Sequence, residues 1–220
     1  VLFFLISLDI AVKLDLGWDA KWFWFIKSLY YFQNYNFSYL SQYEFNSFHP
    51  HFGSYLWAFF RELSLHKFEY SGRIFYAFLY LSSLFFLIDK FEKNKIQNFI
   101  IIFLLLIITY NYKFFSGLQE ILIFSVLAIT TKLIYEYINQ KKNSYLLFII
   151  LCMNLILWIK AEGIAYFMII LVALNFIKNF EFKKRLLLIF SSFGLILFKT
   201  LIYKYFQISL NDQPYFIEYI

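Results

Sequence analysis

The chain has 220 residues, of which 62% are hydrophobic and only 15% are charged, and its formal net charge is +6. A typical soluble domain is roughly 45–50% apolar, and the mean hydropathy of +0.64 leaves too little polar surface to coat a soluble helical protein. The composition therefore predicts an integral membrane protein, and it argues against nucleic-acid binding, which would need the lysines clustered on a folded soluble face.

Apolar runs recur along almost the whole chain and predict an all-α fold, a polytopic transmembrane helix bundle. Residues 1–14 are expected to be the end of a first span, and about six more spans are expected within residues 71–205. The charge-free cores are mostly 13 to 17 residues long, short of the roughly 20 residues of a straight spanning helix. Flanking Lys and Tyr side chains would complete the spans by snorkelling. The runs, about seven with the opening one, lie at about 74–88, 97–110, 117–138, 144–159, 163–177 and 186–203.

The ends of the chain predict a fragment of one transmembrane domain, residues 1–220, truncated at both ends. The sequence starts at Val1 rather than Met, and residues 206–220 are expected to begin a further external segment. The single cysteine, Cys152, lies in an apolar run, so it allows neither an intrachain disulfide nor a cysteine metal cluster.

A long aromatic segment of mixed charge, residues 15–70, is expected to form an external loop that carries amphipathic interfacial helices. Trp18, Trp22 and Ile26 recur at i, i+4, i+8 spacing, which predicts the first of these helices at the membrane surface. Downstream, the stretch "SFHPHFGSYLWAFFREL" opens with a proline and a glycine and predicts the second.

The short connections alternate in charge along the chain. Those at 89–96, 139–143 and 178–185 are rich in lysine, whereas 111–116 and 160–162 carry one lysine each. Lys and Arg in short loops mark the cytoplasmic side of a membrane. The long aromatic segment and the two lysine-poor turns are therefore expected on the outer face, which for a bacterial inner membrane is the periplasmic face.

Four motifs lie in order on this expected outer side. The stretch "GWDAKWFWFIKSLYYF" has an Asp followed by a tryptophan-rich helix. The stretch "FHPHFGSYL" is similar to the pattern HP-x-x-P-L, but this sequence lacks the second proline of that pattern. The stretch "FSGLQEILI" is similar to a G-x-x-D turn with Glu120 in place of Asp, and "LWIKAEGIAY" to a K-N-E-G turn with Ala161 in place of Asn. Together they resemble the GT-C class of integral-membrane glycosyltransferases, which includes protein O-mannosyltransferases and bacterial lipid A aminoarabinose transferases.

The resemblance implies inverting transfer of a sugar from a polyprenyl-phosphate-linked donor to a lipid, glycan or protein acceptor, among membrane lipids at the outer face. An acceptor hydroxyl must lose its proton as it attacks the sugar, and a carboxylate can take that proton as general base. Asp19 is the residue that the resemblance implies for this role.

The donor is implied to be bound by charged side chains near the span ends. Lys160 is the leading cation for the departing lipid phosphate, the helpers are cationic or imidazole groups, and the two glutamates would orient sugar hydroxyls or hold those cations. Gly163 would relax the turn after Lys160, whose cavity is expected to be shared with Asp19. The donor-binding candidates are Lys160, Glu162, Glu120, His49, Lys113 and Arg61.

Five of these candidates also have a structural explanation. Asp19 and Glu120 stand where a helix dipole favours an acid, and His49 beside a proline fits an ordinary loop. Lys160 and Glu162 fit an interfacial anchor pair, because residues two apart do not face each other on a helix. Some GT-C enzymes use a divalent cation, but the "DAK" at Asp19 is not a D-x-D motif, so no metal ligand is assigned.

The non-enzymatic alternative is a polytopic transporter or a flippase for lipid-linked sugars. Such proteins place ionisable residues near mid-bilayer in broken helices. Here the mid-span positions are mostly free of charge and the acids outside the basic loops cluster on one side, which favours chemistry at the membrane surface.

Overall fold

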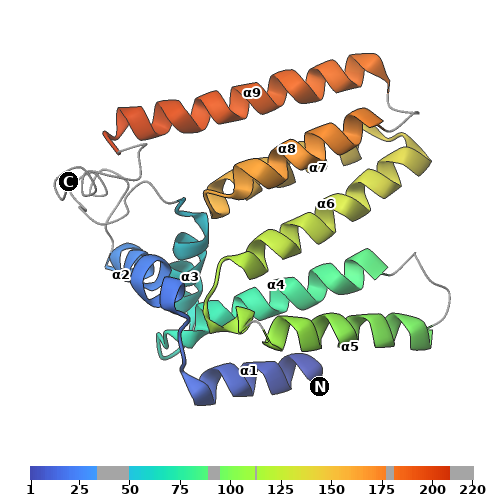
Figure 1. Ribbon diagram of the computed structural model, residues 1–220. Coiled ribbons are helices and arrows are strands. Elements are labelled where there is room, and N and C mark those ends of the chain that lie inside the picture. The colour runs from blue at the N-terminus through green and yellow to red at the C-terminus, as the bar shows by residue number, and fades with distance from the viewer. Residues whose placement is uncertain (34–49, 89–94, 112, 177–180, 209–220) are drawn as a thin grey trace, which may run out of the picture.

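The computed structural model describes residues 1–33, 50–88, 95–111, 113–176 and 181–208 (Figure 1). Every regular element in these ranges is a helix, which confirms the predicted all-α fold. The elements are α1 (Leu2–Lys13), η1 (Ala20–Phe25), α2 (Ile26–Phe32), α3 (Phe52–Leu63), α4 (Tyr70–Ile88), α5 (Lys95–Asn111), η3 (Phe114–Ser116), α6 (Glu120–Gln140), α7 (Asn143–Ile159), α8 (Gly163–Phe176) and α9 (Phe182–Tyr205).

Successive long helices run in opposite directions, across the view in Figure 1. The elements η1, α2 and α3 pack against one end of these helices, which we name the cap end. η3, the start of α6 and the α7–α8 turn lie at the cap end, whereas the lysine-containing α6–α7 turn lies at the opposite end. The alternation of loop charge in the sequence predicts this grouping. The fold therefore collects the expected outer-face segments at a single end of the bundle.

Three of the described helices, α4, α6 and α9, are long and apolar enough to cross a membrane. The prediction of about seven spans is therefore supported for three helices only. α5, α7 and α8 are apolar but shorter. The 14 residues of α8 rise roughly 21 Å at about 1.5 Å per residue, against a hydrocarbon core of roughly 30 Å.

The surface of α9 is apolar over most of its length. Only 17% of its apolar window is buried inside the protein, compared with 61% for α6. Its exposed side chains include Phe190, Phe193, Leu197 and Phe198. Contiguous apolar surface of this kind marks a membrane or protein contact, and it agrees with the membrane character that the composition predicts.

The first interfacial helix forms where the sequence predicts a helix, but its winding differs. Residues Ala20–Phe25 wind as a π-helix before the chain continues as α2. Trp18 and Trp22 are exposed as predicted, whereas Ile26 is half-buried. The prediction assumed regular α-helical winding through this segment, and the π-helix of Ala20–Phe25 departs from it.

Trp57 anchors α3 in the bundle. Its side chain is completely buried, its ring packs edge-on against Tyr76, and its Nε1 donates a hydrogen bond to the Glu69 carbonyl at 2.9 Å. Two glycines make room for it. A Cβ on Gly72 would lie 2.7 Å from the Trp57 Cα, and one on Gly117, where φ is +92°, would lie 2.6 Å from the indole Cη2.

Buried polar contacts fix α3 further against α4 and the start of α6. The Tyr76 hydroxyl donates to the Gly53 carbonyl at 2.6 Å and accepts from Gln119 Nε2 at 3.2 Å. The Ser54 hydroxyl donates to the Trp24 carbonyl at 2.9 Å. Because α3 is tied to both η1 and α4, the cap end is a packed layer rather than a loose loop.

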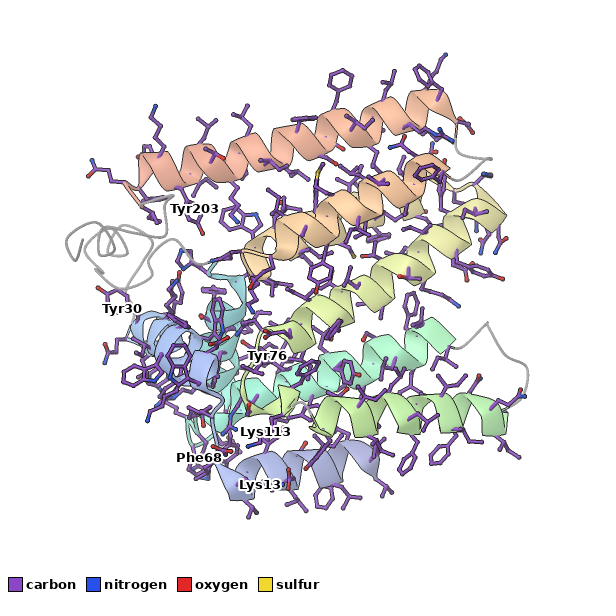
Figure 2. All side chains as sticks on the ribbon, viewed as in Figure 1. Lys13, Tyr30, Phe68, Tyr76, Lys113 and Tyr203 are labelled. Carbon is purple, nitrogen blue, oxygen red and sulfur yellow. The ribbon has the colours of Figure 1, made fainter. Side chains whose placement is uncertain are left out.

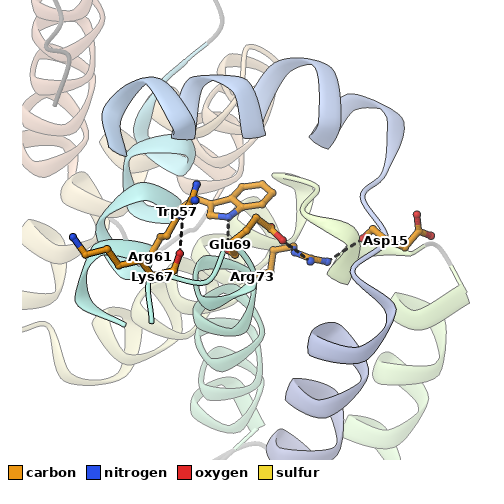
Figure 3. Close-up of polar contacts among 6 residues, drawn as sticks. All are labelled: Asp15, Trp57, Arg61, Lys67, Glu69 and Arg73. Carbon is orange, nitrogen blue, oxygen red and sulfur yellow. Dashed lines mark hydrogen bonds and ion pairs between the residues drawn. The ribbon is translucent and has the colours of Figure 1, made fainter. Parts of the chain in front are cut away.

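Arg73 ties the segment after α1 to the start of α4 (Figure 3). Its buried guanidinium donates two hydrogen bonds, of 2.9 and 2.8 Å, to the Glu69 carboxylate and a third, of 2.9 Å, to the Asp15 carbonyl. Bidentate charge-assisted pairs are among the stronger polar contacts in proteins. This contact sets the position from which the chain enters η1 and brings Asp19 to the cap end.

Candidate functional site

The start of α6 and the α7–α8 turn meet at the cap end and form one charged cluster. Lys160 Nζ lies 2.6 Å from Glu120 Oε1 and 3.3 Å from Glu162 Oε1. Glu120 and Lys160 are 40 positions apart in the sequence. The structure therefore brings together three of the predicted site residues, and we name Glu120, Lys160 and Glu162 the Glu120 cluster.

Gly163 lets the α7–α8 turn close behind this cluster. A Cβ at this position would lie 2.1 Å from the Ile156 carbonyl oxygen, which is backbone and cannot swing aside. Gly163 does not have a left-handed φ angle. The glycine is required for close helix approach, and not for the backbone freedom that the sequence suggests.

The Glu120 cluster lines a cavity of about 180 Å³ together with Ile123, Phe124 and Tyr166. Glu120 Oε1 binds Lys160, while its Oε2 is buried and has no hydrogen-bond partner within the described ranges. With all three groups ionised, two carboxylates face one ammonium and the net charge is −1. Such a cavity disfavours an anionic phosphate and favours a ligand that donates hydroxyl hydrogen bonds.

Two opposing effects set the protonation of Lys160. Burial alone would lower its pKa, but the hydrogen bond and charge of Glu120, together with those of Glu162, raise the pKa above the ordinary 10.5. The ammonium form is therefore retained across the neutral range, and Lys160 cannot act as a general base there.

The stability that this ion pair contributes should be independent of pH from neutral pH up to strongly alkaline conditions. A folded-state pKa above 10.5 means that the contribution is fully present below the unfolded pKa and is lost as pH rises through the folded one. Lys160→Met should cost about 1–3 kcal/mol, because it leaves the Glu120 carboxylate without its charged partner. We expect the gap in melting temperature between wild type and this variant to stay constant from about pH 7 to pH 10 and then to close.

Thermal unfolding in detergent, followed by tryptophan fluorescence at each pH, measures this gap. Lys142→Met serves as control, because Lys142 is exposed at the opposite end of the bundle. A gap that widens as pH rises would contradict the assignment.

Asp19 stands beside the turn that leads into α6, but it does not line the cavity of the Glu120 cluster. It precedes η1, is half-exposed, and makes no side-chain capping hydrogen bond there. Its chain neighbours are fixed to this turn. The Gly17 N–H donates to the Ser116 carbonyl at 2.9 Å, and Ala20 is fully buried next to Gly117. The predicted shared cavity is thus not formed, although both sites lie at the cap end.

Two of the three predicted helpers, Lys113 and Arg61, lie elsewhere. Lys113 lines a separate cavity of about 320 Å³ between α1, α4 and η3. The Arg61 guanidinium lies over the Phe32 ring at 4.0 Å, and its Nε donates to the Lys67 carbonyl at 3.0 Å (Figure 3). His49 lies outside the described residues. Among the described residues that line the cavity of the Glu120 cluster, Lys160 is the one cation.

No protein-family model, curated protein or solved structure matches this chain. The likeness of the four motifs to GT-C enzymes therefore stays a prediction. Within the described ranges, no three His, Cys, Asp or Glu side chains come together as a set that could hold a metal ion, so a divalent cation also stays without assigned ligands.

Two charged residues inside α6 were missed in the sequence because they lie within an apolar run. Lys132 and Glu136 are both buried, their charged groups are 3.7 Å apart, and Gln140 Nε2 donates to Glu136 Oε2 at 2.6 Å. Averaging hydropathy over the run hides this pair. The i, i+4 spacing of the two residues could have revealed it, because residues four apart on a helix are neighbours. The interior of α6 is thus less free of charge than the sequence analysis expects.

Lys199 and His51 are further polar residues that sequence reasoning did not select. Lys199 lies near the end of the last apolar run, and in the structure its Nζ donates to the Leu157 carbonyl at 2.5 Å. His51 is buried against the ring of Tyr203, with 5.8 Å between ring centroids. Both lie at the cap end, where the segments expected on the outer face gather.

Proposed function

We propose that this chain is a membrane glycosyltransferase that moves a sugar, with inversion, from a polyprenyl-phosphate-linked donor to a lipid, glycan or protein acceptor. The observation that supports this most is the Glu120 cluster, because it unites residues from two of the four GT-C-like motifs at one cavity. A packed layer of interfacial helices covers the same end of the bundle and gives a long prenyl chain a surface to follow.

The chemistry of the cluster suits sugar hydroxyls. Carboxylate oxygens accept hydrogen bonds from hydroxyl groups, and the buried Glu120 Oε2 still has an acceptor position to offer. Lys160 is neutralised by two glutamates, so we assign it to holding Glu120 and Glu162 in place rather than to binding the donor phosphate. This assignment revises the role that the family resemblance implies for Lys160.

Asp19 is the proposed general base. The acceptor oxygen attacks the anomeric carbon, its proton passes to the Asp19 carboxylate, and the bond electrons leave with the lipid phosphate. The attachment of the neighbouring backbone to the turn before α6 supports this role, because it holds Asp19 at the same end as the sugar-binding cluster.

The proposed reaction takes place at the outer face of a bacterial inner membrane. In this arrangement α4, α6 and α9 span the bilayer, the shorter apolar helices complete the domain, and the cap end faces the periplasm. Exposed aromatic and aliphatic side chains of the cap fit the membrane–water interface. They are Trp18, Trp22, Tyr55, Phe59 and Leu63.

The test is sugar transfer in membranes that contain the protein, with a panel of radiolabelled polyprenyl-phosphate sugars. Asp19→Asn should lower kcat by at least about 100-fold, as loss of a general base does, with little change in KM. Glu120→Gln should raise KM instead, because it weakens sugar binding. Glu62→Gln is the matched control, since Glu62 is exposed and pairs with Lys67 away from the cluster. Full activity in both Asp19→Asn and Glu120→Gln, or no transfer from any donor, would reject the proposal.

A transporter or flippase is the second candidate, and one observation favours it. Charged residues buried within a spanning helix are costly and often mark a transport pathway, and the Lys132–Glu136 pair is buried in α6. Counter-transport of lipid-linked sugar in liposomes, abolished by Lys132→Met, would move the assignment to this class.

A further inference from the structure

A second cavity at the cap end, of about 230 Å³, lies between the ends of α7 and α9 and the start of α8. Much of its wall is apolar and includes Pro50, Leu157, Ala161 and Ile196. Lys199 and Tyr203 also line it, one turn apart on α9. An apolar cavity with a few convergent polar groups is typical of a ligand site.

Lys199 brings a cation to this cavity, and no carboxylate of the described residues pairs with it. Its Nζ makes one hydrogen bond, to the Leu157 carbonyl, and lies 5.6 Å from the ring centroids of both Trp158 and Tyr203. Among the residues that the structure describes, no carboxylate lies within ion-pair distance of it. Lys160 is the opposite case, because two glutamates neutralise it.

Tyr203 supplies a second, independent polar group. Its side chain is 1% exposed, and its hydroxyl has no hydrogen-bond partner within the described ranges. Figure 2 shows Tyr203 on the side of α9 that faces the bundle, where its ring packs near His51 and Trp158. A buried hydroxyl without a partner is costly, so this group calls for an acceptor that the described chain does not provide.

We propose that the Lys199–Tyr203 cavity binds the phosphate group of a phosphate-bearing amphiphile. One phosphate oxygen would pair with the Lys199 ammonium and another would accept from the Tyr203 hydroxyl, which satisfies both groups with one ligand. Lysine is a common phosphate binder that acts as a point charge. The apolar wall and the exposed lipid-facing side of α9 accommodate a hydrocarbon chain next to the phosphate.

This inference stands on the cavity and not on glycosyl transfer, so binding tests it separately from activity. It also assigns different ligand groups to the two cavities at the cap end. The Glu120 cluster carries a net negative charge and suits hydroxyl groups, whereas the Lys199–Tyr203 cavity carries a positive charge and suits an anion.

The experiment measures equilibrium binding of ³²P-labelled decyl phosphate to the protein purified in a maltoside detergent, which contains no phosphate. Lys199→Met should weaken binding by roughly 10-fold or more, as expected for loss of a charged hydrogen bond. Tyr203→Phe should weaken it by a smaller factor, and Lys199→Arg should retain most of it. Lys204→Met is the matched control, because Lys204 is exposed on the last turn of the same helix.

Competition identifies the source of the phosphate. Displacement by inorganic phosphate would support the site as one for a free phosphate ion as well, whereas displacement by unlabelled decyl phosphate alone would support a lipid headgroup. Equal displacement by decanol would overturn the proposal, because the cavity would then recognise only the chain. Unchanged binding in Lys199→Met would also overturn it, and if that variant fails to fold, unchanged binding in Tyr203→Phe does the same.

Discussion

Replacing Trp57 with alanine should destabilise the protein by about 3–5 kcal/mol, the usual cost of deleting a buried Trp side chain. The indole is completely buried between α3 and α4, and a hydrogen bond from its Nε1 to the Glu69 carbonyl is lost with it. Collapse of the cavity is restricted because Gly72 and Gly117 contribute no side-chain atoms to fill it. The cap should therefore loosen from the bundle before the spanning helices separate.

The measurement is the midpoint of thermal unfolding in detergent, combined with limited proteolysis of the cap. Trp18→Ala is the matched control, because it deletes the same side chain from a position that is 68% exposed. We expect near-wild-type unfolding for Trp18→Ala and early cleavage near α3 for Trp57→Ala. Equal midpoints for the two variants would show that Trp57 is not the anchor.

Replacing Gly163 with alanine should disrupt the Glu120 cluster without changing any of its charged groups. The added Cβ would lie 2.1 Å from the Ile156 carbonyl oxygen, so α8 must shift away from α7. Overpacking of this kind costs about 1–3 kcal/mol of stability. We expect a cost near the upper end of that range, because the added Cβ meets a backbone atom, which cannot move aside as a side chain can. Because Lys160 and Glu162 lie in the turn that moves, the ion pair to Glu120 should lengthen and sugar transfer should fall with it.

Gly194→Ala provides the control for this substitution. Gly194 lies in α9, and a Cβ there would meet no atom within 4 Å. Alanine should stabilise that helix by roughly 0.5–1 kcal/mol relative to glycine. Thermal unfolding should show a loss of stability for Gly163→Ala and a gain for Gly194→Ala. The transfer assay should show lower activity for Gly163→Ala alone. A Gly163→Ala protein as stable and active as Gly194→Ala would show that Gly163 is not needed for the close approach of α7 and α8.

Hydropathy and loop charge were sufficient to predict the helical fold and the grouping of the lysine-poor segments at one end of the bundle. They also predicted that Glu120 and Lys160 would lie at one end, since both stand at helix ends on the same side of the alternation. The number of spans was not predictable, because runs of 13 to 17 apolar residues fall between a buried helix and a bilayer-crossing one. The structure supports three spanning helices by length and composition.

The details of the site depended on features that hydropathy does not carry. Asp19 was expected to share a cavity with Lys160, but the chain path through η1 is set by the Arg73 contact to the Asp15 carbonyl, which no local pattern reveals. Lys199 was hidden inside an apolar run, and its importance arises from the cavity that it shares with Tyr203, whose hydroxyl has no partner among the described residues. Whether two polar side chains share a cavity depends on which face of a helix packs against its neighbour. Hydropathy averaged over a window of residues does not contain that information.

The sparse burial of α9 also determines how its sequence is free to change over evolutionary time. In a helix that presents most of its apolar surface outward, selection acts on the overall hydrophobicity of the helix rather than on the shape of each side chain. Exchanges among Phe, Leu, Ile and Val along it should therefore be nearly neutral. Its residues that meet α7, among them Lys199 and Tyr203, are the exception, and α6, with 61% of its apolar window buried, has far less freedom. Sequence drift should therefore be faster in α9 than in α6.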